Sequence, residues 1–115
     1  MGNVVTQEEA VEGVLKKLTL YRTSPYVHEM KEYTYLKQGY FAPLDEMIIG
    51  ALRVDLGVPV TAANRDALLL QWARVLFKRH TGYEWEATRI PEDELGRILY
   101  DYVNNKAAIV RAIPS

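Results

Sequence analysis

The segment from residue 67 to residue 77 constrains the fold more than any other part of the chain, because it is almost wholly apolar. Its only polar residues are Gln71 and Arg74. Together with Lys78 they recur at three- and four-residue spacing, which places them on one narrow stripe of a helix. A helix with so little polar surface belongs in the middle of a bundle or against another subunit. We therefore expect this helix to form the core.

Capping and stop signals divide the chain into further helices. Thr6 and Glu9 have the spacing of a capping box, and proline follows a capping or loop residue at other predicted starts. Gly82 is expected to stop the central helix, and the pair Asn104-Asn105 the last one. The expected helices span residues 6–21, 25–37, 43–57, 61–80, with Thr61 as cap, and 91–102, and residues 58–60 form an extended connector.

The predicted fold is all-α, a small bundle of four to five helices with an extended C-terminal arm. Residues 1–106 form a single helical domain, although residues 32–36 would also make a short strand. Residues 107–115 form the arm, which is apolar except where Arg111 and Pro114 interrupt it. Proline disfavours a helix that continues to the end. We expect the arm to bind a neighbouring chain.

The composition fits a globular domain and excludes several classes of function. Of the 115 residues 49% are hydrophobic and 25% are charged, and the net charge is −1, which provides no general attraction to nucleic acid or to anionic lipid. The absence of cysteine excludes disulfides and thiol catalysis. The sequence shows neither a signal peptide nor an apolar run long enough to span a membrane.

The polar residues do not form a recognisable catalytic or metal-binding pattern. His28 and His80 each have acidic neighbours, but not the three ligands at suitable spacing that a zinc site requires. The glycines form no phosphate-binding loop. Residues 43–80 resemble a helix-turn-helix only superficially, because their second helix is too apolar to read bases. We expect no enzyme activity, no cofactor and no sequence-specific nucleic acid as partner.

Candidate protein-binding residues come from three groups: an aromatic cluster, a basic run and the apolar arm. Tyrosine combines contact area with a polar tip and is enriched at interfaces, although these aromatics could equally cap the ends of the bundle core. The basic run would also suit a solvated helix C-terminus. The candidates are Tyr26, Tyr33, Tyr35, Tyr40, Phe41, Arg74, Lys78, Arg79, Ile109, Val110, Arg111 and Ile113.

The order of features from residue 58 onward resembles the head-to-tail connector, or adaptor, proteins of tailed bacteriophages. In that family a helix introduced by proline is apolar, then aromatic, then carries arginine, and a second short helix opens with proline after an aliphatic residue. The matching residues are Val58-Pro59, Ala67-Leu68-Leu69-Leu70, Phe77, Arg79, Ile90-Pro91, Leu95, Ile98, Leu99 and Tyr102. They cover about half of the chain.

The resemblance implies a structural protein of the virion without cofactor or catalytic residue. Copies of the chain would form a ring that joins the capsid portal to the tail, with subunits meeting along helix faces and a terminal arm holding its neighbour. The protein would be assembled in the host cytoplasm.

Two other classes of function remain open on the sequence. Residues 1–6 match the acceptor pattern for N-myristoylation at Gly2, as in a helical viral matrix protein. Alternatively, the protein is a small inhibitor or regulator that docks on an enzyme through the tyrosine-rich residues 26–41.

Overall fold

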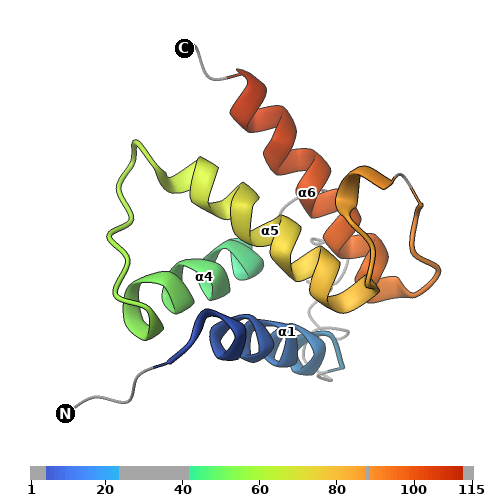
Figure 1. The fold of residues 1–115 in the computed structure, drawn as a ribbon, viewed down its shortest axis with the longest axis horizontal. Coiled ribbons are helices and arrows are strands. Elements are labelled where there is room, and N and C mark those ends of the chain that lie inside the picture. Colours follow the sequence, from blue (N-terminus) through green and yellow to red (C-terminus); the bar gives the residue numbers. More distant parts are fainter. Residues whose placement is uncertain (1–4, 24–41, 88, 113–115) are drawn as a thin grey trace.

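The computed structural model describes residues 5–23, 42–87 and 89–112, and within these ranges the protein is an all-α bundle (Figure 1). The four α-helices there are α1 (Gln7–Thr23), α4 (Ala42–Gly50), α5 (Arg65–Thr81) and α6 (Glu94–Ala112), with a π-helical turn η1 (Ala51–Asp55) and a 3-10 turn η2 (Trp85–Ala87). The predicted fold class is confirmed. The predicted helix at residues 25–37 lies outside the described residues.

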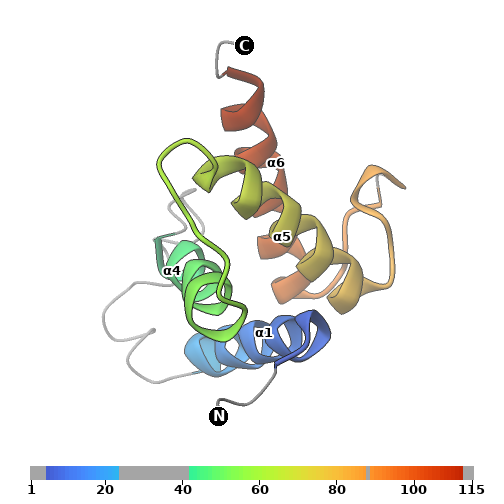
Figure 2. The same ribbon diagram turned by 60° about the vertical axis from the view of Figure 1, so that its left-hand side comes forward.

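Helix α5 is the centre of the bundle, as its apolar sequence predicts. It packs most extensively against α6 and also contacts α1 and α4 (Figure 2). Its buried residues are Leu69, Trp72, Ala73, Leu76 and Phe77. The polar stripe of Gln71, Arg74 and Lys78 is exposed. A helix that buries side chains against three neighbours needs little polar surface, which explains its composition.

The capping box predicted at the start of α1 is confirmed. The backbone N–H of Glu9 donates to Thr6 Oγ1 at 3.1 Å, and the backbone N–H of Thr6 donates to Glu9 Oε1 at 3.2 Å. These bonds satisfy amides that lack a partner inside the helix. They fix where α1 begins, and thereby which residues of its first turns face α5.

The third predicted helix, at residues 43–57, changes its geometry half-way. It begins at Ala42 as α4, and from Ala51 its turn widens into η1, where the backbone N–H of Leu56 donates to the oxygen of Ala51 at 3.0 Å. Such a bond spans five residues and defines a π turn. Gly57, at φ 64°, ends the segment because this left-handed conformation costs glycine little.

The central helix begins one turn later than predicted. Thr61 and Asn64 exchange hydrogen bonds, in which the Thr61 N–H donates to Asn64 Oδ1 at 2.7 Å and the Asn64 N–H to Thr61 Oγ1 at 3.3 Å. Thr61 therefore caps a leading turn, and the regular helix starts at Arg65. Gly82 ends the helix as predicted: it adopts φ 80°, and its N–H donates to the Lys78 oxygen at 2.7 Å.

The predictions for the last helix and the C-terminal arm are wrong. α6 begins at Glu94 rather than Pro91 and continues past Asn104-Asn105 to Ala112, so residues 107–112 are helical and not extended. Asn costs a helix only about 0.7 kcal/mol per residue, whereas burying an apolar face gives more. That face continues through Lys106 and Ala107, which are 5% and 4% exposed. The division of the chain at residue 106 therefore falls inside one helix.

Candidate interaction surface

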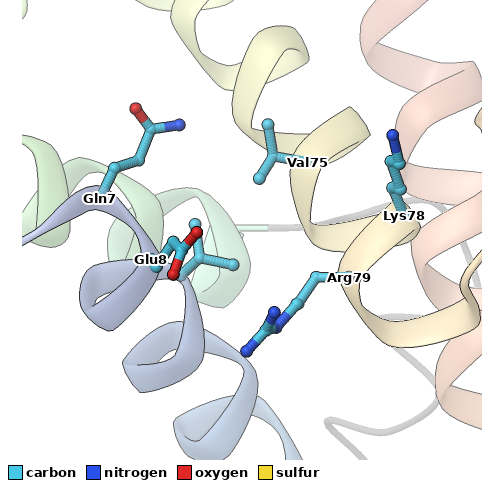
Figure 3. A pocket seen from close by; sticks show the side chains of 6 residues that line it. Gln7, Glu8, Val75, Lys78 and Arg79 are labelled. Atoms are coloured by element: carbon cyan, nitrogen blue, oxygen red, sulfur yellow. The ribbon is translucent and has the colours of Figure 1, made fainter.

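A hollow of about 640 Å³ lies between the start of α1 and the C-terminal half of α5. We call it the α1–α5 groove; it is lined by Gln7, Glu8, Val11, Val75, Lys78 and Arg79. Figure 3 shows Gln7 and Glu8 on α1 facing Val75 and Arg79 on α5. Val11 belongs to the core and Val75 packs against it, so the base of the groove is apolar and its rim is polar.

Two residues of the basic run of α5 have acidic partners in neighbouring segments. Lys78 pairs with Glu84, and Arg79 pairs with Glu12 of α1. Both pairs are about half exposed or more, so each contributes little to stability. They nevertheless offset the charges of Lys78 and Arg79, which favours the interpretation of this run as a solvated helix C-terminus.

Arg74, in the middle of α5, and His80, near its end, contact the connection to α6. The guanidinium of Arg74 lies 5.4 Å from the ring centre of Trp85, within the range of a cation–π contact. The Trp85 Nε1 atom is buried and has no acceptor among the described residues. His80 Nε2 lies 2.7 Å from Asp93 Oδ2. These contacts hold the connection against the end of α5.

Asp93 serves both His80 and the first turn of α6. Its Oδ2 accepts the backbone N–H of Gly96 at 2.9 Å, which makes Asp93 the cap of the helix. Partial burial raises the pKa of Asp93, but the hydrogen bonds from His80 and Gly96 outweigh burial and hold this pKa below its usual value. A carboxylate stabilised in this way fixes the start of α6 next to α5.

A second hollow, of about 490 Å³, lies on the other side of the Arg79–Glu12 pair. Its lining residues come from the middle of α1 and the end of α5, and are Glu12, Gly13, Leu15, Lys16, Thr19, Arg79 and His80. The ion pair therefore separates two shallow depressions along one helix junction. Both depressions contain side chains of either charge, as expected of a protein-contact surface rather than of a site for one small ion.

The C-terminal end of α6 is the second candidate surface. Both ribbon views show its last turns projecting past the other helices (Figures 1 and 2). Ile109 and Val110 are half-buried there, whereas Tyr102 and Val103 two turns earlier are completely buried. Arg111 is exposed. The apolar face of α6 thus continues into a part of the helix that is only partly covered.

A buried polar cluster joins α4, α5 and α6, and sequence reasoning missed it. Asp45 is 8% exposed; its Oδ1 accepts from the Tyr102 hydroxyl, and its Oδ2 accepts from Lys106 Nζ at 3.1 Å and from Arg65 Nη2 at 3.4 Å. Burial, then the charge of Asp45, raises the pKa of Tyr102 far above its usual value, so this hydroxyl remains a donor. The available signal was Lys106, four residues after Tyr102 on the apolar face of α6.

The structure brings only some of the predicted interaction residues together. Lys78 and Arg79 line the α1–α5 groove, and Arg74 lies beside Trp85. Ile109, Val110 and Arg111 lie at the end of α6. The remaining candidates lie outside the residues whose placement is described: Gly2, Tyr26, Tyr33, Tyr35, Tyr40, Phe41 and Ile113.

Two negative findings apply to the described part of the chain. Its histidine, aspartate and glutamate side chains form no group of three or more that could hold a metal ion. None of its helices is both long enough and apolar enough to cross a membrane.

Comparison with protein-family models, with curated proteins and with solved structures found no match to this chain.

Proposed function

We propose that this protein is a non-enzymatic structural subunit of a tailed-phage virion, which forms a ring between the capsid portal and the tail. The observation that carries the proposal is the projecting end of α6 (Figures 1 and 2), where Ile109 and Val110 continue the apolar face of the helix and remain partly exposed. An apolar helix end of this kind gains stability when a neighbouring chain covers it.

The rest of the described surface supports an assembly role. The α1–α5 groove has an apolar base and a polar rim, an arrangement that resembles the centre and edge of a protein interface. The proposal assigns the subunit contacts to helix faces and to the helical end of α6, in place of the extended arm that the sequence predicts. It places the protein in the virion after assembly in the host cytoplasm.

Virions of the phage that encodes the chain provide the test. Quantitative mass spectrometry of purified particles should detect the protein at a copy number expected for one ring, and electron microscopy of the purified chain with its portal should show a ring. Absence from the particles would contradict the proposal.

The purified protein also distinguishes this proposal from the two alternatives, a matrix-like protein and an enzyme inhibitor or regulator. An acyl group on the native N-terminus would favour the matrix-like protein. A monomer or dimer that binds an enzyme at simple stoichiometry would favour the inhibitor or regulator.

A further inference from the structure

We propose that the α1–α5 groove receives the C-terminal end of α6 from a second copy of this chain. The inference rests on the proposed function, because it names the contact through which copies would join. It is carried by the chemistry of the two surfaces and by their positions in one molecule.

The groove offers an apolar base and one uncompensated negative charge. Val11 and Val75 contribute to the base. The cations at the rim already have acidic partners, Glu84 for Lys78 and Glu12 for Arg79. The side chain of Glu8, on the same rim, forms no hydrogen bond or ion pair within the described ranges 5–23, 42–87 and 89–112. The groove therefore favours an apolar segment that carries a positive charge.

The end of α6 has this character. Ile109 and Val110 follow Lys106 by three and four residues, so they lie on the face of α6 that packs into the core. Both are half-buried. Arg111 follows directly, is exposed, and has no ion-pair partner in the part of the chain that the structure describes. Two branched side chains would meet the apolar base, and Arg111 would meet Glu8.

The groove is large enough for such an insertion. Its volume of about 640 Å³ lies within the range of roughly 300–1,000 Å³ typical of pockets that enclose a small ligand. Two aliphatic side chains and one turn of backbone are no larger than such a ligand.

The positions of the two surfaces require a second copy. In both ribbon views α1 lies at one end of the molecule and the last turn of α6 at the other, and the second view is turned about the vertical axis, so the separation is not an effect of projection (Figures 1 and 2). α6 therefore cannot fill the groove of its own chain. A contact between two different surfaces is heterologous, and it produces a closed ring or an open filament.

Cysteine pairing tests the geometry directly, because the chain contains no cysteine of its own. Gln7→Cys labels the groove, Ala112→Cys labels the α6 end, and Glu46→Cys on exposed α4 surface is the control. One variant of each pair is labelled with the heavy isotope of nitrogen, so that mass spectrometry distinguishes mixed from like disulfide dimers.

We expect a mixture of Q7C and A112C to form mixed disulfide dimers several-fold faster than either variant forms like dimers. Mixtures of either variant with E46C should form mixed dimers at the slower rate. Equal rates for like and mixed dimers would overturn the proposal. A chain that sediments as a monomer at roughly millimolar concentration would overturn it too.

A charge exchange tests the Glu8–Arg111 pairing. Sedimentation equilibrium should show association of E8R and of R111E weakened about three- to tenfold, since a rim pair gives way to like charges. The E8R/R111E double variant should regain the association of the unchanged protein, because an arginine at position 8 now faces a glutamate at position 111. Val110→Asp should weaken association more strongly; because Val110 is half-buried, this variant should also unfold at a lower temperature, so its association is measured well below that temperature.

If none of these substitutions changes the strength of association, the groove contact is refuted. If the protein is nevertheless found in virions, the proposed function stands without this contact. If head-to-tail pairing is observed but virions lack the protein, only the proposed function fails.

Discussion

Replacing Lys106 with methionine tests whether the buried cluster holds α4, α5 and α6 together. The ammonium lies 3.1 Å from Asp45 Oδ2, and the Lys106 and Asp45 side chains are 6% and 12% exposed. Methionine fills a similar volume without charge. The substitution therefore leaves the carboxylate of Asp45 buried with one cation fewer.

The cost follows from what remains around that carboxylate. Removing one member of a buried ion pair costs about 3–5 kcal/mol when the other is left alone. Asp45 keeps the Tyr102 hydroxyl and, at 3.4 Å, Arg65, whose side chain is 42% exposed and therefore partly screened. We expect K106M to lower the free energy of unfolding by about 2–3 kcal/mol, and the melting temperature by roughly 10 °C.

Urea unfolding followed by circular dichroism measures this change. D45N leaves Lys106 buried without its counter-charge and should also be destabilising, whereas D45N/K106M should cost at least about 1 kcal/mol less than the sum of the two. Lys16→Met, on the exposed side of α1, is the matched control and should change stability by less than about 0.5 kcal/mol. The reasoning is refuted if K106M behaves like this control or if the two substitutions are additive.

Three further predictions concern local geometry and pH. Gly96→Ala should destabilise the protein by about 1–3 kcal/mol, because a Cβ there would lie 2.5 Å from a proline side-chain carbon; Gly13→Ala, with nothing within 4 Å, should instead stabilise α1 by about 0.5–1 kcal/mol. Thermal unfolding compares the two variants. The pKa of Tyr102 is raised above 10.0, so the contribution of its protonated hydroxyl to folding stability is complete below about pH 10 and is lost as the pH rises. Above that pH the free energy of unfolding should fall by about 1.4 kcal/mol per pH unit. Tyr102→Phe should lack this slope in urea titrations. The pKa of Asp93 is lowered from 3.8, so its contribution is present above about pH 4 and lost as the pH falls. Asp93→Asn, which keeps a capping oxygen but loses the charge that faces His80, should cost a few tenths of a kcal/mol near neutral pH and nothing at about pH 2 in the same assay.

The features that sequence predicted correctly are those that depend on near neighbours in the chain. Thr6 and Glu9 stand three residues apart, and Gly82 needs only its own backbone freedom and the preceding helical turn. Such signals give helix ends and types. The apolar residues of α5 also predicted its central position, because a helix with only a narrow polar stripe must be covered on its other sides.

The features that sequence missed depend on partners far away in the chain. Asp45 meets Lys106 across 61 residues, and without the fold it suits the first turn of a helix equally well. The pair Asn104-Asn105 suggests a helix end, but the weak local preference of asparagine is overcome by the packing of α6 against α5. Tertiary contacts therefore decided the length of the last helix and the place of the buried charges.

The buried cluster also sets the direction of the proposed binding element, since both lie on α6. Lys106 is bound to Asp45 one turn before Val110, so this bond helps to fix the rotation of α6 about its axis and with it the direction of the apolar face at its end. Loss of the bond would let α6 turn or slide without losing its helical structure. K106M should therefore reduce association between copies even at temperatures where it stays folded. An effect of K106M on stability alone would mean that packing against α5, and not the buried charge, orients the end of α6.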